Sequence, residues 1–233
     1  MAANQFGAAR YRQLSQQRLV DSTGREMPGY LADPSRKCTQ AVIVVHDFFG
    51  LTEHVKSVSG RLAGEGFVAF APDLYRGRVA GTPEEAATLA QSIAWNRVAI
   101  ELGLAVQALQ EKTEGGSVAI CGFAMGGAAA LVAAASIEKL AAAVTFYGIP
   151  KDVSIENRHV KIQGHFASRD RKCTPDRVEA LDQALTKRGG MHQFYSYEAD
   201  NGFLNPTRPA VHSASLAQLA WDRAVSFLRS ACA

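Results

Sequence analysis

Residues 117–127, with the sequence SVAICGFAMGG, decide the fold. A short apolar β-type run leads into a turn of small residues, and an alanine-rich helix start follows. This order is typical of a strand-turn-helix elbow of the G-x-nucleophile-x-G type, whose sharp bend lifts the central side chain to the tip of a sheet as a nucleophile. The central residue here is Ala124, and a methyl group cannot attack an electrophile. The sequence therefore has the frame of a nucleophile elbow without the nucleophile.

Strands and helices are expected to alternate on both sides of the elbow. Residues 41–45 (AVIVV) and 67–71 (FVAFA) are continuous apolar runs, typical of strands buried on both faces of a parallel sheet. A small polar turn at 21–24 predicts an antiparallel edge hairpin. Further strands are predicted at 142–147, 160–166 and 193–197, and helices at 53–65, 82–112 in one or two pieces, 128–137, 175–188 and 210–228. The pattern predicts an α/β fold with a mostly parallel central sheet and helices on both faces.

Length and charge narrow the class of protein. A chain of 233 residues with this pattern predicts a single domain over 1–233, with residues 1–14 as a disordered N-terminal segment. The formal net charge of +3 comes from 25 basic and 22 acidic residues without a long basic run, which argues against a nucleic-acid partner. No apolar stretch approaches the roughly 20 residues of a membrane span, so no membrane partner is expected either.

The four cysteines, Cys38, Cys121, Cys173 and Cys232, are widely spaced. They form no C-x-x-C pair, and no histidine cluster has the spacing of metal ligands, which argues against a disulfide framework or a zinc site. We therefore expect a cytoplasmic protein with no metal and no cofactor.

Four motifs occur in an order that resembles the dienelactone hydrolase family of α/β-hydrolases. They are HDFFGL at 46–51, APDLY at 71–75, GFAMGG at 122–127, and YEADNGF at 197–203 followed by NPTRP at 205–209. The resemblance covers the chain from about residue 41 to residue 228. It implies an α/β-hydrolase fold and a small-molecule carbonyl, ester or lactone ligand.

The resemblance also assigns residues to the family's catalytic positions. Ala124 occupies the position of the nucleophile, Asp170 that of the acid, and Asn201 that of the histidine. Asp47 stands where the family usually has a glutamate near the first buried strand. Two of the three triad positions are therefore chemically silent, since an asparagine cannot relay a proton at neutral pH.

Other side chains are weighed as replacements for the missing groups. Cys121, on the predicted strand, is interpreted as a small buried hydrophobic residue. His165, at a strand end, leaves a structural and a catalytic role open. Asp47 is either a partly desolvated carboxylate with a raised pKa, suited to acid-base work, or a loop cap that accepts backbone hydrogen bonds.

Ligand-binding residues are expected around the same cleft. Met125 would supply the backbone N–H of an oxyanion hole, and the arginines would hold an anionic ligand by bidentate contacts. Solvated surface arginines and plain core packing of aromatic rings are the alternatives. The predicted substrate-binding residues are Phe48, Tyr75, Arg76, Met125, Tyr147, Phe203 and Arg208, with Arg78 and Trp95 as further candidates.

Three functions remain open from the sequence. The first is binding of a small aromatic or polyketide-like carbonyl compound, with a non-hydrolytic cyclisation, dehydration or isomerisation. The second is an ester or lactone hydrolase inactivated by engineering. The third is a non-catalytic binding or assembly protein, which a cleft filled by Phe123, Met125 and Phe203 would favour. A homodimer is also open.

Overall fold

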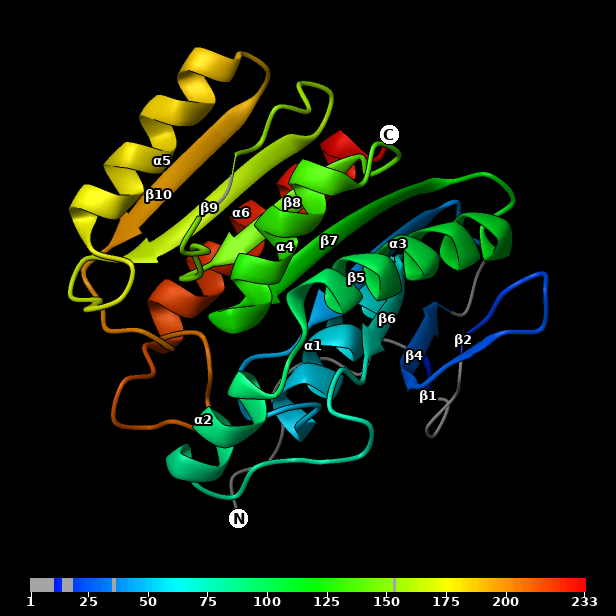
Figure 1. Ribbon diagram of the computed structural model, residues 1–233, viewed down its shortest axis with the longest axis horizontal. Coiled ribbons are helices and arrows are strands. Elements are labelled where there is room, and N and C mark those ends of the chain that lie inside the picture. Colours follow the sequence, from blue (N-terminus) through cyan, green and yellow to red (C-terminus); the bar gives the residue numbers. More distant parts are fainter. Residues whose placement is uncertain (1–10, 14–18, 35–36, 153) are drawn as a thin grey trace.

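The computed structural model describes residues 11–13, 19–34, 37–152 and 154–233 (Figure 1). The elements alternate along most of this length, as the apolar pattern predicts. Within the described residues, no helix is both long enough and apolar enough to pass through a membrane.

Eight strands form the central sheet, in the order β1-β4-β6-β5-β7-β8-β9-β10. The pairs β1–β4 and β4–β6 are antiparallel, and all the other neighbours are parallel. The predicted hairpin at 21–24 joins β2 to β3 in a separate two-stranded sheet. The strands are β1 (Tyr11–Gln13), β2 (Leu19–Val20), β3 (Glu26–Met27), β4 (Gly29–Pro34), β5 (Gln40–Val45), β6 (Val68–Pro72), β7 (Ser117–Phe123), β8 (Ala142–Phe146), β9 (Lys161–Ala167) and β10 (His192–Tyr197).

Helices cover both faces of this sheet (Figure 1). The helices are α1 (Glu53–Gly64), α2 (Pro83–Gln91), α3 (Trp95–Lys112), α4 (Met125–Ser136), α5 (Pro175–Arg188) and α6 (Ala214–Ala231). Residues of α1 and α6 share one apolar core with Val42 and Val44 of β5, whereas α3, α4 and α5 share the other core with Ile43 and Val45. Because successive side chains of a strand point to opposite faces, one buried strand serves both cores. The α/β-hydrolase architecture predicted from the sequence is confirmed.

Two details differ from the sequence prediction. The last helix begins at Ala214 and not near residue 210, because residues 203–213 form turns held by local hydrogen bonds. Part of the predicted N-terminal segment, Tyr11–Gln13, forms β1, which pairs with β4. The rest of that 1–14 segment lies outside the described residues.

The elbow between β7 and α4 is built as the sequence predicts. A Cβ atom at Gly122 would overlap the carbonyl oxygen of Gly126, and one at Gly126 would overlap the carbonyl oxygen of Val45. Only glycines permit this close approach of the turn to the neighbouring strand. The bend therefore sits directly against β5, at the carboxyl edge of the parallel strands.

Candidate active site

The largest cavity described, of ≈ 1170 Å³, lies at the carboxyl edge of the sheet. The elbow, the end of β8, the loops after β5, β9 and β10, and helix α2 all contribute to its wall. Of the three side chains whose packing would have favoured a non-catalytic binding or assembly protein, Met125 lines the cavity, whereas Phe123 and Phe203 do not, so these side chains do not fill it. In open α/β sheets, ligands bind outside the carboxyl ends of the strands.

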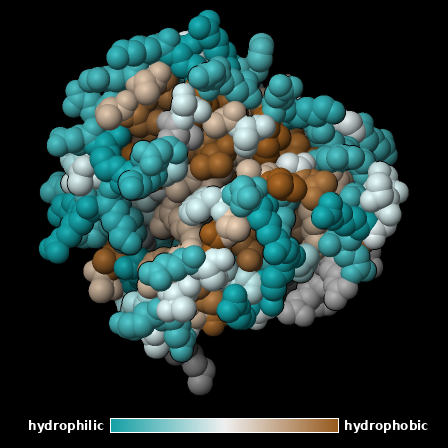
Figure 2. Space-filling view, viewed as in Figure 1, coloured by the Kyte–Doolittle hydropathy of each residue, from teal (hydrophilic) through white to brown (hydrophobic). Residues whose placement is uncertain are grey.

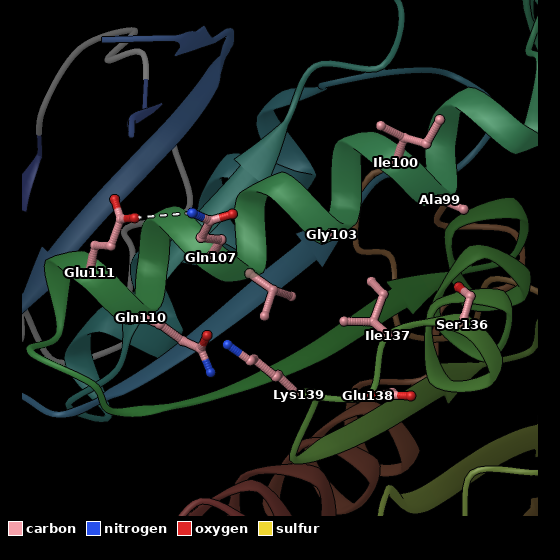
Figure 3. Close-up of a pocket in the computed structure, with 11 residues that line it drawn as sticks. Ala99, Ile100, Gly103, Gln107, Gln110, Glu111, Ser136, Ile137, Glu138 and Lys139 are labelled. Atoms are coloured by element: carbon pink, nitrogen blue, oxygen red, sulfur yellow. Dashed lines mark hydrogen bonds between the residues drawn. The ribbon is translucent and has the colours of Figure 1, made fainter. Parts of the chain in front are cut away.

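A second cavity, of ≈ 800 Å³, lies between α3 and the residues that follow α4 (Figure 3). Its wall includes Ile100, Gln107, Ser136 and Lys139. Residues 137–139 precede β8, so this cavity faces the amino edge of the parallel strands, away from the elbow. Figure 2 shows hydrophobic residues on the face that α3 and α4 cover, within a hydrophilic surround. The cavity at the carboxyl edge is the candidate active site, because the elbow lies in its wall and ligands bind at this edge of open α/β sheets.

Ala124 lies at the apex of the elbow with φ 49° and ψ −108°. Its N–H donates to the carbonyl oxygen of Phe146 at 2.9 Å, and its own carbonyl accepts from the Ala128 N–H at 3.0 Å. A positive φ at a residue with a side chain is strained, and such strain is concentrated at functional turns. The backbone geometry of a nucleophile elbow is therefore present around a methyl group.

Two backbone donors are free beside this apex. Within the described chain, neither the Met125 N–H nor the Phe48 N–H donates a hydrogen bond, and both residues line the cavity. Met125 follows the apex, and Phe48 belongs to the loop after β5. These are the two places from which α/β-hydrolases take their oxyanion donors.

Asp170 and Asn201 meet in the same cavity wall. The Asn201 amide donates from Nδ2 to Oδ2 of Asp170 at 2.6 Å. The other carboxylate oxygen of Asp170 accepts the N–H groups of Lys172, at 2.7 Å, and Cys173, at 3.1 Å. Because Nδ2 is held by Asp170, the amide oxygen of Asn201 and its second N–H remain for other partners. The pair is fixed, but it contains no imidazole to act as the general base of a triad.

Asp47 combines both readings that the sequence left open. Its Oδ1 accepts the Phe49 N–H at 2.9 Å, which makes it a loop cap. Burial raises the pKa of Asp47, and the Phe49 hydrogen bond and the positive charge of Arg208 offset this only in part. Asp47 does not line the cavity itself, yet its charge acts on the phenol of Tyr147, which does.

The predicted binding residues divide into two groups. Phe48, Met125, Tyr147 and Arg208 line the cavity. Tyr75 lies just behind it, where its hydroxyl donates to the carbonyl oxygen of Phe48 at 3.1 Å and contacts the Met125 sulfur at 3.6 Å.

Two other predicted residues lie away from the cavity wall. Arg76 pairs with Glu101 of α3 at the surface. Phe203 is fully buried and packs edge-on against Tyr147, with ring centroids 5.9 Å apart.

His165 and Cys121 do not replace the missing groups. His165 is fully buried, with Nδ1 2.8 Å from the Tyr197 hydroxyl and Nε2 2.9 Å from Oε1 of Gln163. Burial lowers the pKa of His165 to about 3, so the imidazole stays neutral in a structural network. Burial also raises the pKa of Cys121 to about 12, which leaves its thiol protonated and unreactive.

Sequence reasoning missed a set of cations around the cavity. Lys151, Arg171 and Lys172, from the loops after β8 and β9, join Arg208 in its wall. None of these four side chains forms an ion pair with a carboxylate of the described residues. The R-D-R-K run at 169–172, shortly after the strand predicted at 160–166, was the available signal. The described residues contain no group of three or more side chains arranged to hold a metal ion.

The sequence profile of the Dienelactone hydrolase family matches residues 27–232. The chain belongs to this family. It is 32% identical over 223 residues to an Aquifex aeolicus (strain VF5) protein named provisionally as a carboxymethylenebutenolidase, covering 90% of this chain and 96% of that one.

Two solved structures have the same fold. A provisionally named dienelactone hydrolase from Klebsiella pneumoniae subsp. pneumoniae MGH 78578 superposes with a TM-score of 0.81 and 26% identity, over 92% of this chain and 97% of that one. A dienelactone hydrolase-like promiscuous phosphotriesterase from metagenomic libraries also has a TM-score of 0.81, over 96% of this chain and 99% of that one. At 20% identity, the second shows the fold alone.

Proposed function

We propose that this chain binds a small anionic carbonyl compound, aromatic or polyketide-like, and acts on it by acid-base chemistry without an acyl-enzyme intermediate. The reaction class is proton transfer next to a carbonyl group, as in an isomerisation, a dehydration or a cyclisation. The observation that carries the proposal is an alanine at the apex of a strained elbow, in a cavity whose wall includes Lys151, Arg171, Lys172 and Arg208. None of these four cations forms an ion pair with a carboxylate of the described residues.

The charge of the cavity supports an anionic ligand. Lys151, Arg171, Lys172 and Arg208 attract a carboxylate, and an arginine can hold it through two parallel hydrogen bonds. The name of the Aquifex relative describes a butenolide, which is an unsaturated lactone, with a carboxymethylene group. A ligand with a carboxylate at one end and a carbonyl group at the other would fit both features.

Asp47 is the proposed base. A raised pKa brings a carboxylate closer to the pH at which it can both accept and return a proton. Because Asp47 lies behind the cavity wall, it would act through one bridging water. That water would take a proton from the carbon next to the ligand's carbonyl group and pass a proton to Asp47, and the C–H electrons would form a C=C bond while the negative charge moves to oxygen. The Met125 N–H would stabilise that oxygen. Return of the proton to another carbon completes an isomerisation, and its transfer to a departing hydroxyl group completes a dehydration.

Ligand binding is tested by thermal unfolding with lactones, aryl esters and phenolic acids, each compared with its uncharged methyl ester where it has a free carboxylate. Binding at a hundredfold excess over Kd stabilises the native state by about 2.7 kcal/mol, or roughly 5–10 °C in a chain of this size. We expect shifts with the carboxylates and not with the methyl esters. Equal shifts with both would contradict the anionic ligand.

Catalysis is tested by exchange of the ligand's α-proton in D₂O, followed by NMR. Asp47→Asn should slow the exchange at least a hundredfold. The matched control is Asp73→Asn, because Asp73 also caps a loop through its carboxylate but, unlike Asp47, does not act electrostatically on Tyr147 in the cavity wall. Unchanged exchange in Asp47→Asn would remove Asp47 from the mechanism.

A second candidate is an ester or lactone hydrolase inactivated by replacement of its nucleophile and base. The strained backbone at Ala124 and the hydrogen bond between Asp170 and Asn201 favour it, since both are parts of a hydrolase frame. The double variant Ala124→Cys with Asn201→His should then turn over 4-nitrophenyl acetate rapidly. Turnover no faster than that of Ala124→Cys alone would favour the first candidate. A cytoplasmic location and a homodimer stay predictions from the sequence.

A further inference from the structure

Tyr147, the residue after β8, is held in place by its backbone. It has φ 43°, a second strained turn beside that of Ala124. Its N–H donates to the carbonyl oxygen of His165 at 2.8 Å, and its carbonyl oxygen accepts the thiol of Cys173 at 3.4 Å. The Thr145 hydroxyl closes the same turn by donating to the carbonyl oxygen of Gly148 at 2.6 Å. The position of the Tyr147 side chain is thus fixed before any ligand arrives.

The ring of Tyr147 is buried, but its hydroxyl has no partner. Tyr147 is 4% exposed, and its ring packs against Phe203 and Phe123, with ring centroids 5.9 Å and 6.3 Å away. No hydrogen bond to its hydroxyl occurs among the residues that the structure describes. The hydroxyl is not one of the fully buried polar atoms without a partner, so it is open to the cavity whose wall Tyr147 lines. A free, accessible hydroxyl on a rigidly held, strained residue in this wall is well placed to bind a ligand.

Charged groups from three loops surround this phenol. Asp47, Asp170 and Arg208 all act on it electrostatically. Burial, together with the two carboxylates, raises the pKa of Tyr147 well above its usual range, and Arg208 opposes this only in part. The hydroxyl therefore keeps its proton and can act as a hydrogen-bond donor, but not as a base.

We propose that the Tyr147 hydroxyl donates a hydrogen bond to the carbonyl oxygen of the ligand. This inference rests on the proposed function and adds a side-chain donor to the developing oxyanion, beside the free backbone N–H groups of Met125 and Phe48. Tyr147 would touch the reacting group directly, which makes it a catalytic residue. No full proton transfer is needed, because the donor only polarises the C=O bond.

Benzoylformate and benzoate separate this role from anion binding. Both carry an aromatic ring and a carboxylate, but only benzoylformate has a ketone, and it has no α-proton to react. We expect Tyr147→Phe to weaken benzoylformate binding at least tenfold and to change benzoate binding less than twofold. The ketone carbon of ¹³C-labelled benzoylformate should shift downfield on binding to the wild type and not on binding to Tyr147→Phe.

The control is Tyr195→Phe, a partly buried tyrosine of β10 outside the cavity wall, which should bind both compounds as the wild type does. Tyr147→Phe keeps the ring packing and removes an unpaired hydroxyl, so its unfolding midpoint should equal or exceed that of the wild type. Unchanged benzoylformate affinity and ¹³C shift in Tyr147→Phe would overturn the inference and leave the proposed function standing. Failure of both compounds to bind the wild type would overturn the two together.

Discussion

Ala124 retains a backbone conformation that serves a side chain it does not have. Strain of this kind costs about 1–3 kcal/mol, and glycine adopts positive φ angles readily. Ala124→Gly should therefore raise the free energy of unfolding by about 1 kcal/mol, after subtraction of the entropy that glycine adds to the unfolded chain. Urea denaturation measures the change. Ala180→Gly, at an exposed position inside α5, should instead lose about 1 kcal/mol. A loss of stability in both variants would show that the elbow is not strained.

Asp47 should reveal its buried charge through the pH dependence of stability. Because burial raises its pKa in the folded state, the folded chain binds this proton more tightly than the unfolded chain does. The contribution of Asp47 to stability is therefore fully present below its unfolded pKa and is lost as the pH rises through the folded pKa. Asp47→Asn, which can still accept the Phe49 N–H, should be more stable than the wild type at pH 7 and equal to it near pH 3. Urea titrations at the two pH values measure the difference, and a variant that is less stable at pH 7 would contradict the raised pKa.

The site was predictable where its residues share a motif with their strand. Ala124 and Asn201 lie in short segments that carry the family pattern, and the structure brings both to one cavity. Lys151 and Arg171 could not be assigned from their own surroundings, because only the convergence of two loops places them in the same wall. The prediction that Arg76 binds substrate was not met for the same reason. The local motif cannot show that Arg76 pairs with Glu101 of α3, which lies 25 residues later in the chain.

At the scale of elements, the apolar pattern predicted the strands and helices that form the two cores, because each buried face repeats apolar residues at the spacing of its strand or helix. Turns held by side chains were not predictable in this way. The start of α6 was set too early, since His212 donates from Nδ1 to the carbonyl oxygen of Phe203 at 2.9 Å, and Asn205 accepts the Thr207 N–H at 2.9 Å. Such bonds compete with helix formation and leave no periodic signal.

Helix α2 is attached to the rest of the molecule by a small cluster of its own. Ala86 and Leu89 of α2 pack with Tyr75 and Ala80, apart from the two main cores, while Ala87 and Ala90 line the cavity. Leu89→Ala should therefore loosen α2 locally by about 2–3 kcal/mol, with faster hydrogen exchange over 83–91 and weaker ligand binding. Leu102→Ala, in a main core, should instead lower the global free energy of unfolding by about 2–5 kcal/mol. Equal exchange at all amides of Leu89→Ala would show that α2 unfolds only with the whole domain.

At the scale of the whole molecule, three buried histidines make the fold sensitive to acid. His46, His54 and His165 are each at most 9% exposed. Burial lowers the pKa of His54 to about 4 and that of His165 to about 3, and it lowers the pKa of His46 as well. Nε2 of His46 accepts the Leu74 N–H, and Nε2 of His54 has no hydrogen-bond partner. In both rings, a proton added to Nε2 would therefore have no group to which it could donate a hydrogen bond.

The unfolded chain binds these protons below its ordinary histidine pKa of about 6.5, whereas the folded chain does not until much lower pH. The contribution of these histidines to the free energy of unfolding is therefore fully present above pH 6.5, and it is lost as the pH falls towards their pKa values in the folded chain. For His54 and His165 the loss between pH 7 and pH 5 is about 2 kcal/mol each.

His54→Phe replaces a ring that packs edge-on against Phe123 with an apolar ring that does not titrate. The variant should therefore lose about 2 kcal/mol less stability than the wild type between pH 7 and pH 5. Urea denaturation at pH 7 and pH 5 measures it, with His159→Phe, at an exposed histidine, as the control that keeps the wild-type slope. If His54→Phe also keeps that slope, His54 is protonated in the folded chain and its burial does not govern its titration.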